Sequence, residues 1–186
     1  MIRNLLVSSA ILFAVSGATA APCSNAPYTK VMPDHKGIEY GMNINQALQA
    51  VKSLYRGKAR FKKEDGTISV KFLPAHQEVF DEVLFLSTNG VITSMVWSYS
   101  NGFQRRLGGP SDAFLAVLKK IKEKIDGADD NNKLDKGYSF SWNAKEGLAL
   151  TAIGVDPFTI LTRFDCKTLE DTEKAKVRQN TNMGFW

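Results

Sequence analysis

The clearest pattern of apolar and polar residues in the chain runs from position 82 to 101, EVLFLSTNGVITSMVWSYSN. Two apolar, β-rich runs flank Asn89-Gly90, a dipeptide that tolerates the positive φ angles of a type I′ turn. Counting outward from this turn pairs Leu86 with Thr93 and puts apolar residues on both faces of the hairpin. A hairpin of this kind is typical of the interior of a sheet. We therefore expect these two strands to lie at the centre of the fold.

A second hairpin is predicted at positions 58–73, KARFKKEDGTISVKFL, around Asp65-Gly66. Apolar and polar residues alternate along both of its strands, so that each face has one character. The apolar face consists of Ala59, Phe61, Ile68, Val70 and Phe72. The polar face consists of Arg60, Lys62, Glu64, Thr67, Ser69 and Lys71. We expect the first face to meet the core and the second to meet water.

Apolar residues recur at helical spacing in two other segments. The first segment starts at Asn43, a good N-cap, and can end at Gly57. The second segment follows Pro110, with Ser111 as its expected N-cap, and Gly127 can terminate it. We therefore expect two amphipathic helices, each of which packs one apolar stripe against the sheet.

After a polar loop at 126–137, alternation predicts three further strands at about 138–143, 148–155 and 158–165. The expected order of elements is α-β-β-β-β-α-β-β-β. This order indicates an α+β fold in which two helices pack on one face of a mainly antiparallel sheet of about seven strands.

The C-terminal residues 167–186 are polar and lack a long apolar face. We expect a loosely ordered tail, apart from a possible short helix near 169–177. The chain ends with Phe185-Trp186, and the sequence leaves open whether this pair folds back onto the body or anchors a partner. We therefore assign residues 21–166 to a single α+β domain and residues 167–186 to the tail.

The first twenty residues, MIRNLLVSSAILFAVSGATA, combine Arg3 with an apolar run and small residues before Ala21. This combination is typical of a cleavable secretory signal peptide, with the cut after Ala20. No later segment approaches the roughly eighteen apolar residues of a transmembrane helix. We therefore expect a soluble protein that is periplasmic or secreted.

Two cysteines, Cys23 and Cys166, remain after cleavage and are 143 positions apart. Because disulfides persist in exported proteins, we expect these cysteines to pair. Closing a loop of this length stabilises a fold by at most about 5 kcal/mol in the chain-entropy model. The alternative, two free thiols with a redox or metal role, is disfavoured because the sequence has no CxxC spacing.

Export also changes the charge balance, because removal of Arg3 lowers the net charge from +5 to +4. A mildly basic protein suits an acidic protein partner or an anionic envelope component, whereas export argues against nucleic acid. The sequence contains no GxSxG elbow and no phosphate-binding loop, which lowers the prior for the common hydrolases.

The most specific surface feature is the basic polar face of the hairpin at 58–73. Glu64 is the only acid on that side of the hairpin, and Phe103 stands beside a second pair of cations. A solvated surface explains the alternation, and a docking surface for an acidic protein is the functional interpretation. The candidate partner-binding residues are Arg56, Lys58, Arg60, Lys62, Lys71, Arg105 and Arg106.

His76, Glu78 and Asp81, with Glu82, form the one cluster that could serve as an acid/base or metal site. Their spacing fits no standard metal motif, and we interpret them as a solvated acidic connection. The loop at 126–137 is rich in oxygen ligands but lacks the Gly and Glu positions of a calcium loop. The sequence therefore predicts no cofactor, no metal and no catalytic residue.

Two successive units of a helix followed by antiparallel strands resemble the β-lactamase inhibitory proteins and other exported binding modules. The resemblance concerns the order of elements alone, and a fold does not fix a function.

Together with export, the disulfide and the basic face, this order favours a non-enzymatic binding protein. An inhibitor, immunity or accessory factor that recognises another envelope protein is the expected role. The alternatives are a small periplasmic hydrolase or metal-dependent enzyme using His76 with Glu78 or Asp81, and a carrier of a small ligand.

Overall fold

The computed structural model describes residues 23, 32–33, 35, 37–124, 131–134, 137–145, 148–155 and 159–182. The predicted signal peptide and Phe185-Trp186 lie outside the described residues. The strands are β1 (Ala59–Glu64), β2 (Thr67–Phe72), β3 (Phe80–Thr88), β4 (Val91–Tyr99), β5 (Asn131–Leu134), β6 (Gly137–Lys145), β7 (Leu148–Val155) and β8 (Thr159–Cys166). The helices are α1 (Ile44–Leu54), the 3₁₀ turn η2 (Pro74–His76), α2 (Asn101–Arg106), α3 (Pro110–Lys124) and α4 (Lys167–Asn182).

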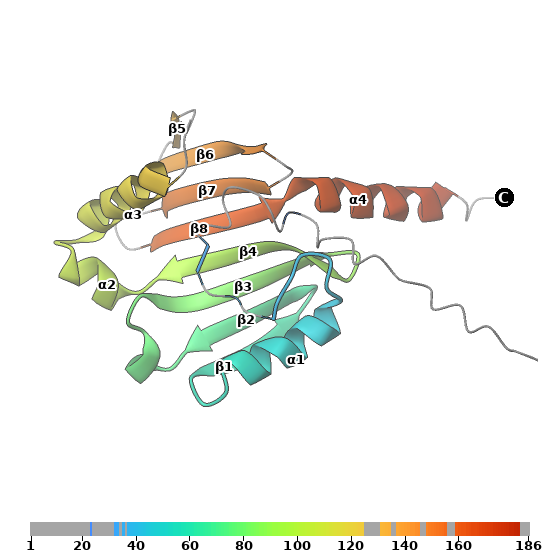
Figure 1. Cartoon of the computed structure of the whole chain (residues 1–186), viewed down its shortest axis with the longest axis horizontal. Helices are drawn as coiled ribbons and strands as arrows, with labels where there is room; N and C mark the ends of the chain where they lie inside the picture. Colours follow the sequence, from blue (N-terminus) through green and yellow to red (C-terminus); the bar gives the residue numbers. More distant parts are fainter. Residues whose placement is uncertain are drawn as a thin grey trace, which may run out of the picture.

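The described strands form one sheet in the order β1-β2-β3-β4-β8-β7-β6-β5, with antiparallel neighbours throughout (Figure 1). The predicted α+β class is confirmed, whereas the predicted strand number and the order of elements are wrong. Strand β5 forms inside the segment 126–137 that was expected to be a loop, and α2 follows β4 where only a break was expected. Both are too short to produce a periodic pattern, which is the reason that the sequence did not reveal them.

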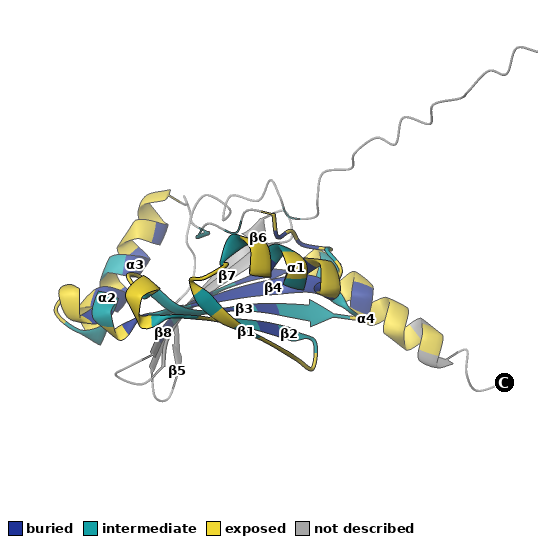
Figure 2. Cartoon of the chain, turned by 90° about the horizontal axis from the view of Figure 1, so that it is seen from below, coloured by how far each residue is buried: buried dark blue, intermediate teal, exposed yellow. Residues whose placement is uncertain are grey.

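Helices α1 and α3 cover the same face of the sheet (Figure 2). Their buried residues join those of the central strands in one hydrophobic core, because each helix turns a single apolar stripe toward the strands. The largest fully buried side chains are Trp97, Phe85, Phe164, Ile38, Ile68, Ile92, Met95, Ile160, Val51 and Val70.

The central hairpin turns at Asn89-Gly90 as predicted, with φ angles of 51° and 78°. The register then shifts between Leu86 and Ser87, so that Leu86 lies opposite Ser94 and not opposite Thr93. The predicted pairing is therefore wrong beyond the first two residue pairs. The physical reason is a β-bulge, which adds one residue to β4 at this point, and a second irregularity of the same ladder lies between Phe80 and Glu82.

The bulge determines which side chains of β4 enter the core. Strict alternation would put Ile92 on the opposite face from Met95 and Trp97. With one extra residue between them, all three point toward the helices, and their exposed fractions are 0%, 0% and 1%. Phe85 and Val83, which lie opposite Met95 and Trp97, are buried with them.

The hairpin of β1 and β2 has the two faces that its sequence predicted. Phe61 lies opposite Val70, and Arg60 lies opposite Lys71. Val70 is fully buried, whereas Arg60 and Lys71 are exposed. The turn at Asp65-Gly66 has φ angles of 40° and 78°, as a type I′ turn requires.

The predicted start of the first helix is also confirmed. Asn43 has extended backbone angles, and its side-chain oxygen accepts a hydrogen bond from the Asn45 amide at 2.9 Å. The predicted N-cap of the second long helix is wrong, because α3 begins at Pro110 and Ser111 lies inside it. Proline has no amide hydrogen and a helical φ angle, so it fits the first position of a helix.

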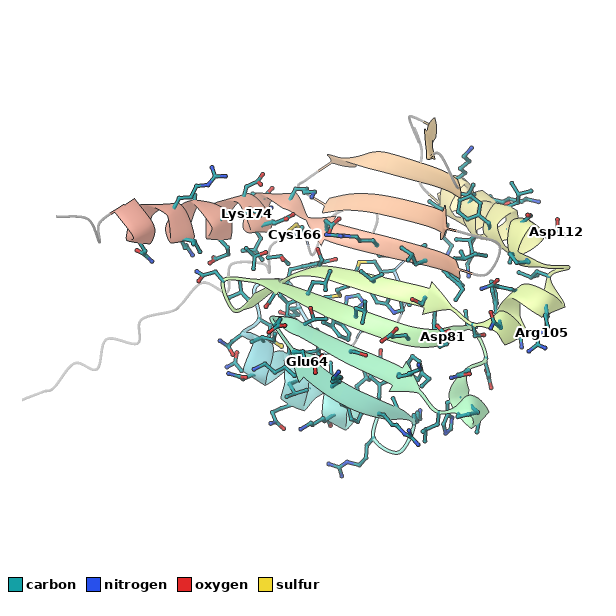
Figure 3. The ribbon with its side chains drawn as sticks, turned by 180° about the vertical axis from the view of Figure 1, so that it is seen from behind. Glu64, Asp81, Arg105, Asp112, Cys166 and Lys174 are labelled. Carbon is teal, nitrogen blue, oxygen red and sulfur yellow. A yellow bond between two sulfur atoms is a disulfide. The ribbon has the colours of Figure 1, made fainter. Side chains whose placement is uncertain are left out.

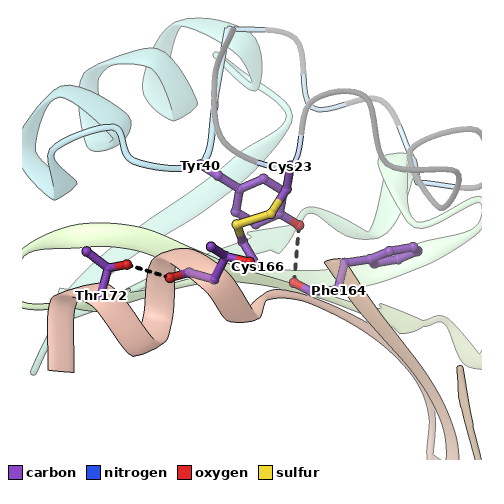
Figure 4. Close-up of a disulfide and its surroundings, with 6 residues drawn as sticks. Cys23, Tyr40, Phe164, Cys166 and Thr172 are labelled. Carbon is purple, nitrogen blue, oxygen red and sulfur yellow. Dashed lines mark hydrogen bonds between the residues drawn. A yellow bond between two sulfur atoms is a disulfide. The ribbon is translucent and has the colours of Figure 1, made fainter. Parts of the chain in front are cut away.

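The predicted disulfide between Cys23 and Cys166 is present, with the Cα atoms 6.0 Å apart (Figure 4). It fastens the segment before α1 to the end of β8. Beside it, the Tyr40 hydroxyl donates to the carbonyl oxygen of Phe164 at 3.2 Å. Burial and the nearby charge of Asp165 raise the pKa of Tyr40 above its usual value, so the hydroxyl stays neutral.

Helix α4 starts directly after Cys166 and continues past the end of the sheet (Figure 1). It is longer than the short helix expected near 169–177. Glu173, with an exposed fraction of 5%, accepts hydrogen bonds from Asn89 at 3.0 Å and Lys176 at 2.7 Å. The contact with Asn89 ties α4 to the turn of the central hairpin. Over the described part of the chain, no helix is long and apolar enough to cross a membrane.

Replacing both cysteines by alanine should lower the free energy of unfolding by about 2–5 kcal/mol, because the unfolded chain regains the entropy of an open loop. Alanine is chosen because a serine hydroxyl at the buried position 166 would add a second cost. Urea unfolding followed by tryptophan fluorescence measures the difference. Reduced wild-type protein is the control and should unfold at nearly the same urea concentration as the variant. Equal midpoints for oxidised and reduced wild type would contradict this role of the disulfide.

Candidate functional site

The sheet has a second face, opposite α1 and α3, which we call the open face. Figure 3 looks onto it, with these two helices behind the strands. The strand register assigns alternate residues of β1, β2, β3, β4 and β8 to it. They are Arg60, Lys62, Glu64, Thr67, Ser69, Lys71, Glu82, Leu84, Leu86, Ser94, Val96, Ser98, Leu161, Arg163 and Asp165.

Three of the predicted partner-binding cations meet on the outer part of this face. Arg60 lies directly opposite Lys71, and Lys62 is two residues along β1 on the same side. All three are exposed. Lys62 contacts Glu64 at 2.7 Å, but both side chains are more than half exposed, at 68% and 60%. A solvent-exposed ion pair of this kind contributes little to the stability of the fold, so Lys62 can exchange Glu64 for an anion of a partner at a small cost in free energy.

The next strand limits how far the positive charge extends. Glu82 on β3 lies opposite Lys71 and accepts a hydrogen bond from the Ser69 hydroxyl at 2.6 Å. From the sequence, Glu64 was the only acid expected on the polar face of this hairpin. The sequence could not show that β3 places a second carboxylate, that of Glu82, beside Lys71. The basic surface is therefore confined to β1 and β2.

A polar network that the sequence did not predict lies further along the open face, where β4 meets β8. The Arg163 Nε donates to both oxygens of Asp165, at 2.8 and 2.9 Å. The Ser94 hydroxyl also donates to Asp165, and it lies 3.5 Å from the Arg163 guanidinium. The Asp165 side chain is 7% exposed and that of Arg163 is 40% exposed. The alternation at 158–165 put the two charges on one face, but only the pairing of β8 with β4 adds the serine.

The other predicted cations come from other elements. Arg56 and Lys58 are exposed in the turn between α1 and β1. Arg105 and Arg106 lie on α2, which packs against α3. The Arg106 guanidinium donates to the carbonyl oxygen of Glu78, so it is engaged in holding the segment before β3. The basic residues therefore form separate groups.

The cluster named as an alternative active site is only partly assembled. His76 and Glu78 line a shallow pocket of about 340 Å³ together with Tyr55, Lys58 and Phe72. Asp81 does not line it. Among the residues that the structure describes, no group of three His, Cys, Asp or Glu side chains is placed to hold a metal ion.

Asp81 is unusual for another reason. Its Oδ1 atom is buried and has no hydrogen-bond partner among the described residues. Burial raises the pKa of this carboxyl, and the charge of Glu82 raises it further, while hydrogen bonds from the backbone amides of residues 81 and 82 and the charge of Lys71 lower it without cancelling the rise. The ionised form is therefore less stable in the folded protein than in the unfolded chain.

The Asp81→Asn variant should consequently be more stable than wild type at pH 7. Because the pKa of Asp81 is higher in the folded protein than in the unfolded chain, the wild type loses stability as pH rises through the folded-state pKa. The advantage of the variant should therefore shrink as pH falls and vanish once aspartate is protonated in both states. Thermal unfolding between pH 3 and pH 8 would show this, with Glu64→Gln, at an exposed position, as the control. A difference that does not change with pH would contradict the assignment.

Comparison with known proteins adds no assignment, since no family model, curated protein or solved structure matches this chain.

Proposed function

We propose that this protein is an exported, non-enzymatic binding protein that docks an acidic surface of another envelope protein. The observation that carries the proposal is the set of three exposed cations, Arg60, Lys62 and Lys71, on the same side of β1 and β2. In this role the protein would be an inhibitor, an immunity protein or an accessory factor.

The mechanism of recognition follows from the position of the cations. Clustered positive charge accelerates the encounter with an acidic partner and disfavours basic ones. Because the cations project from strands, their spacing is set by the ladder: the Cα partners Arg60 and Lys71 face each other across β1 and β2. An acidic partner thus meets cations whose backbone positions are already fixed, although each exposed side chain still loses rotamer freedom on binding.

The hairpin is a firm support for this surface. Ile68 and Val70, on the reverse side of β2, have exposed fractions of 0% and pack into the core. The same strand pairs along its other edge with β3. A docking surface on strands fixed in this way changes little on binding, which favours slow dissociation once contacts are made.

Export is the second part of the proposal. It is supported by the signal-peptide pattern of residues 1–20 and by the disulfide, which is the kind of bond that persists in oxidising compartments. A partner in the same compartment follows from this location.

Reversal of the three charges tests the docking surface. Immobilised Arg60→Glu/Lys62→Glu/Lys71→Glu protein should retain its acidic partner from an envelope extract at least about tenfold less than wild type, because attraction becomes repulsion. Quantitative mass spectrometry of the retained proteins measures the change. Thermal unfolding should show a loss of stability of at most about 1 kcal/mol per substitution, because the new carboxylates at positions 60 and 71 lie opposite each other and position 71 lies opposite Glu82.

The matched control reverses three exposed cations on helices, Lys52→Glu/Lys119→Glu/Arg178→Glu, and so has the same net charge. It should retain the partner as wild type does. Equal losses for both variants would show that net charge matters and the surface does not. Full retention by the first variant would refute the docking surface.

A further inference from the structure

A half-open cavity of about 450 Å³ lies between α3 and the sheet, on the side opposite the open face. Residues of α2, α3, β3, β4 and β8 form its walls, and Met32 and Pro33 of the segment before α1 close one side. Small-ligand pockets usually measure roughly 300–1,000 Å³. The cavity is therefore large enough for a ligand of modest size.

Its inner surface is mainly aromatic and aliphatic. The rings of Phe80 and Tyr99 lie 4.9 Å apart between centroids, and those of Tyr99 and Phe103 lie 5.2 Å apart. All three side chains are only partly buried, so they are accessible from the cavity. Val117 and Phe164 are also part of the wall. An apolar ligand entering here would leave water without losing hydrogen bonds.

Two polar side chains of the cavity lining, those of Tyr99 and Thr162, are hydrogen-bond partners of each other. Thr162 has an exposed fraction of 2%. Burial raises the pKa of Tyr99 to about 12, so its hydroxyl is neutral at physiological pH. A ligand segment rich in amides or hydroxyls would find few partners here, and each unpaired polar group would weaken binding. An alkyl chain makes no such demand.

The rim has the opposite character. Lys120 and Lys124 line the cavity from successive turns of α3, and both are exposed. No acidic side chain is among the described residues of the lining. Glu123, the nearest acid along the helix, lies instead with Lys119 around another hollow. The mouth of the cavity is therefore positively charged, and lysine stems can extend along the apolar wall.

We infer that this cavity binds a single-chain acyl carboxylate, with its alkyl chain among Phe80, Tyr99 and Phe103 and its carboxylate between Lys120 and Lys124. The inference does not depend on the docking function, because the two sites lie on opposite faces of the sheet. It would give the protein a ligand of its own in the envelope.

Dodecanoate, used below the concentration at which it forms micelles, is a suitable probe. Isothermal titration calorimetry should show saturable binding to the mature wild-type protein. The Lys120→Glu/Lys124→Glu variant should bind about tenfold more weakly or worse, which corresponds to about 1.4 kcal/mol. The control Lys119→Glu/Lys122→Glu has the same charge change on the same helix and should bind within about twofold of wild type, a difference of about 0.4 kcal/mol.

Two further measurements separate the cavity from nonspecific adsorption. Ala116→Phe adds a ring at the partly buried wall and should abolish binding while circular dichroism stays unchanged. Dodecyltrimethylammonium, with the same chain and a cationic head, should not bind. Absence of saturable binding to wild type, equal weakening by both lysine pairs, or equal binding of the cationic amphiphile would overturn the inference.

Discussion

The whole structure depends on the pairing of β4 with β8. This ladder joins the hairpins at 59–99 to the C-terminal strands, and the residues that it pairs are more than sixty positions apart in the chain. Trp97 on β4 lies opposite Thr162 and packs edge-on against Phe164 at 5.4 Å between ring centroids. Such contacts form only after a long loop has closed, which costs conformational entropy. Once formed, they join the two halves of the sheet.

The disulfide acts on the same junction. Cys166 ends β8 and is bonded to Cys23, and close to this bond the Tyr40 hydroxyl donates to the carbonyl oxygen of Phe164. One end of β8 is thus held by a ladder, a covalent bond and a buried hydroxyl. The two faces of the sheet differ: one is covered by α1 and α3, and the other carries the charged side chains of β1 and β2 beside apolar residues of β3, β4 and β8.

The turns, the start of α1 and the two faces of the first hairpin could be predicted from residues close together in the sequence. Asn89-Gly90 and Asp65-Gly66 specify their turns, Asn43 specifies the start of α1, and strict alternation separates Val70 from Lys71. What the sequence could not show depends on residues far apart in the chain. The bulge in β4 is favoured because it brings Ile92 into the same core as Met95, and no local pattern records that gain.

In the candidate site, too, some features follow from local sequence and others depend on residues far apart in the chain. The row of cations on β1 and β2 could be predicted, since it follows from alternation within one hairpin. The approach of Glu82 to Lys71 and the contact of Asp165 with Ser94 required knowledge of which strands are neighbours. Sequence reasoning also grouped Asp81 with His76, whereas the structure places Asp81 outside the pocket that His76 lines.

The central claim is that the outer part of the open face is where a partner binds, and photo-crosslinking in intact cells tests it most directly. A photoreactive residue at position 62 lies on this face, and one at position 52 lies on the exposed side of α1. The account predicts a discrete adduct with one acidic envelope protein from position 62 and none from position 52. No adduct at position 62, or the same adduct from both positions, would contradict it.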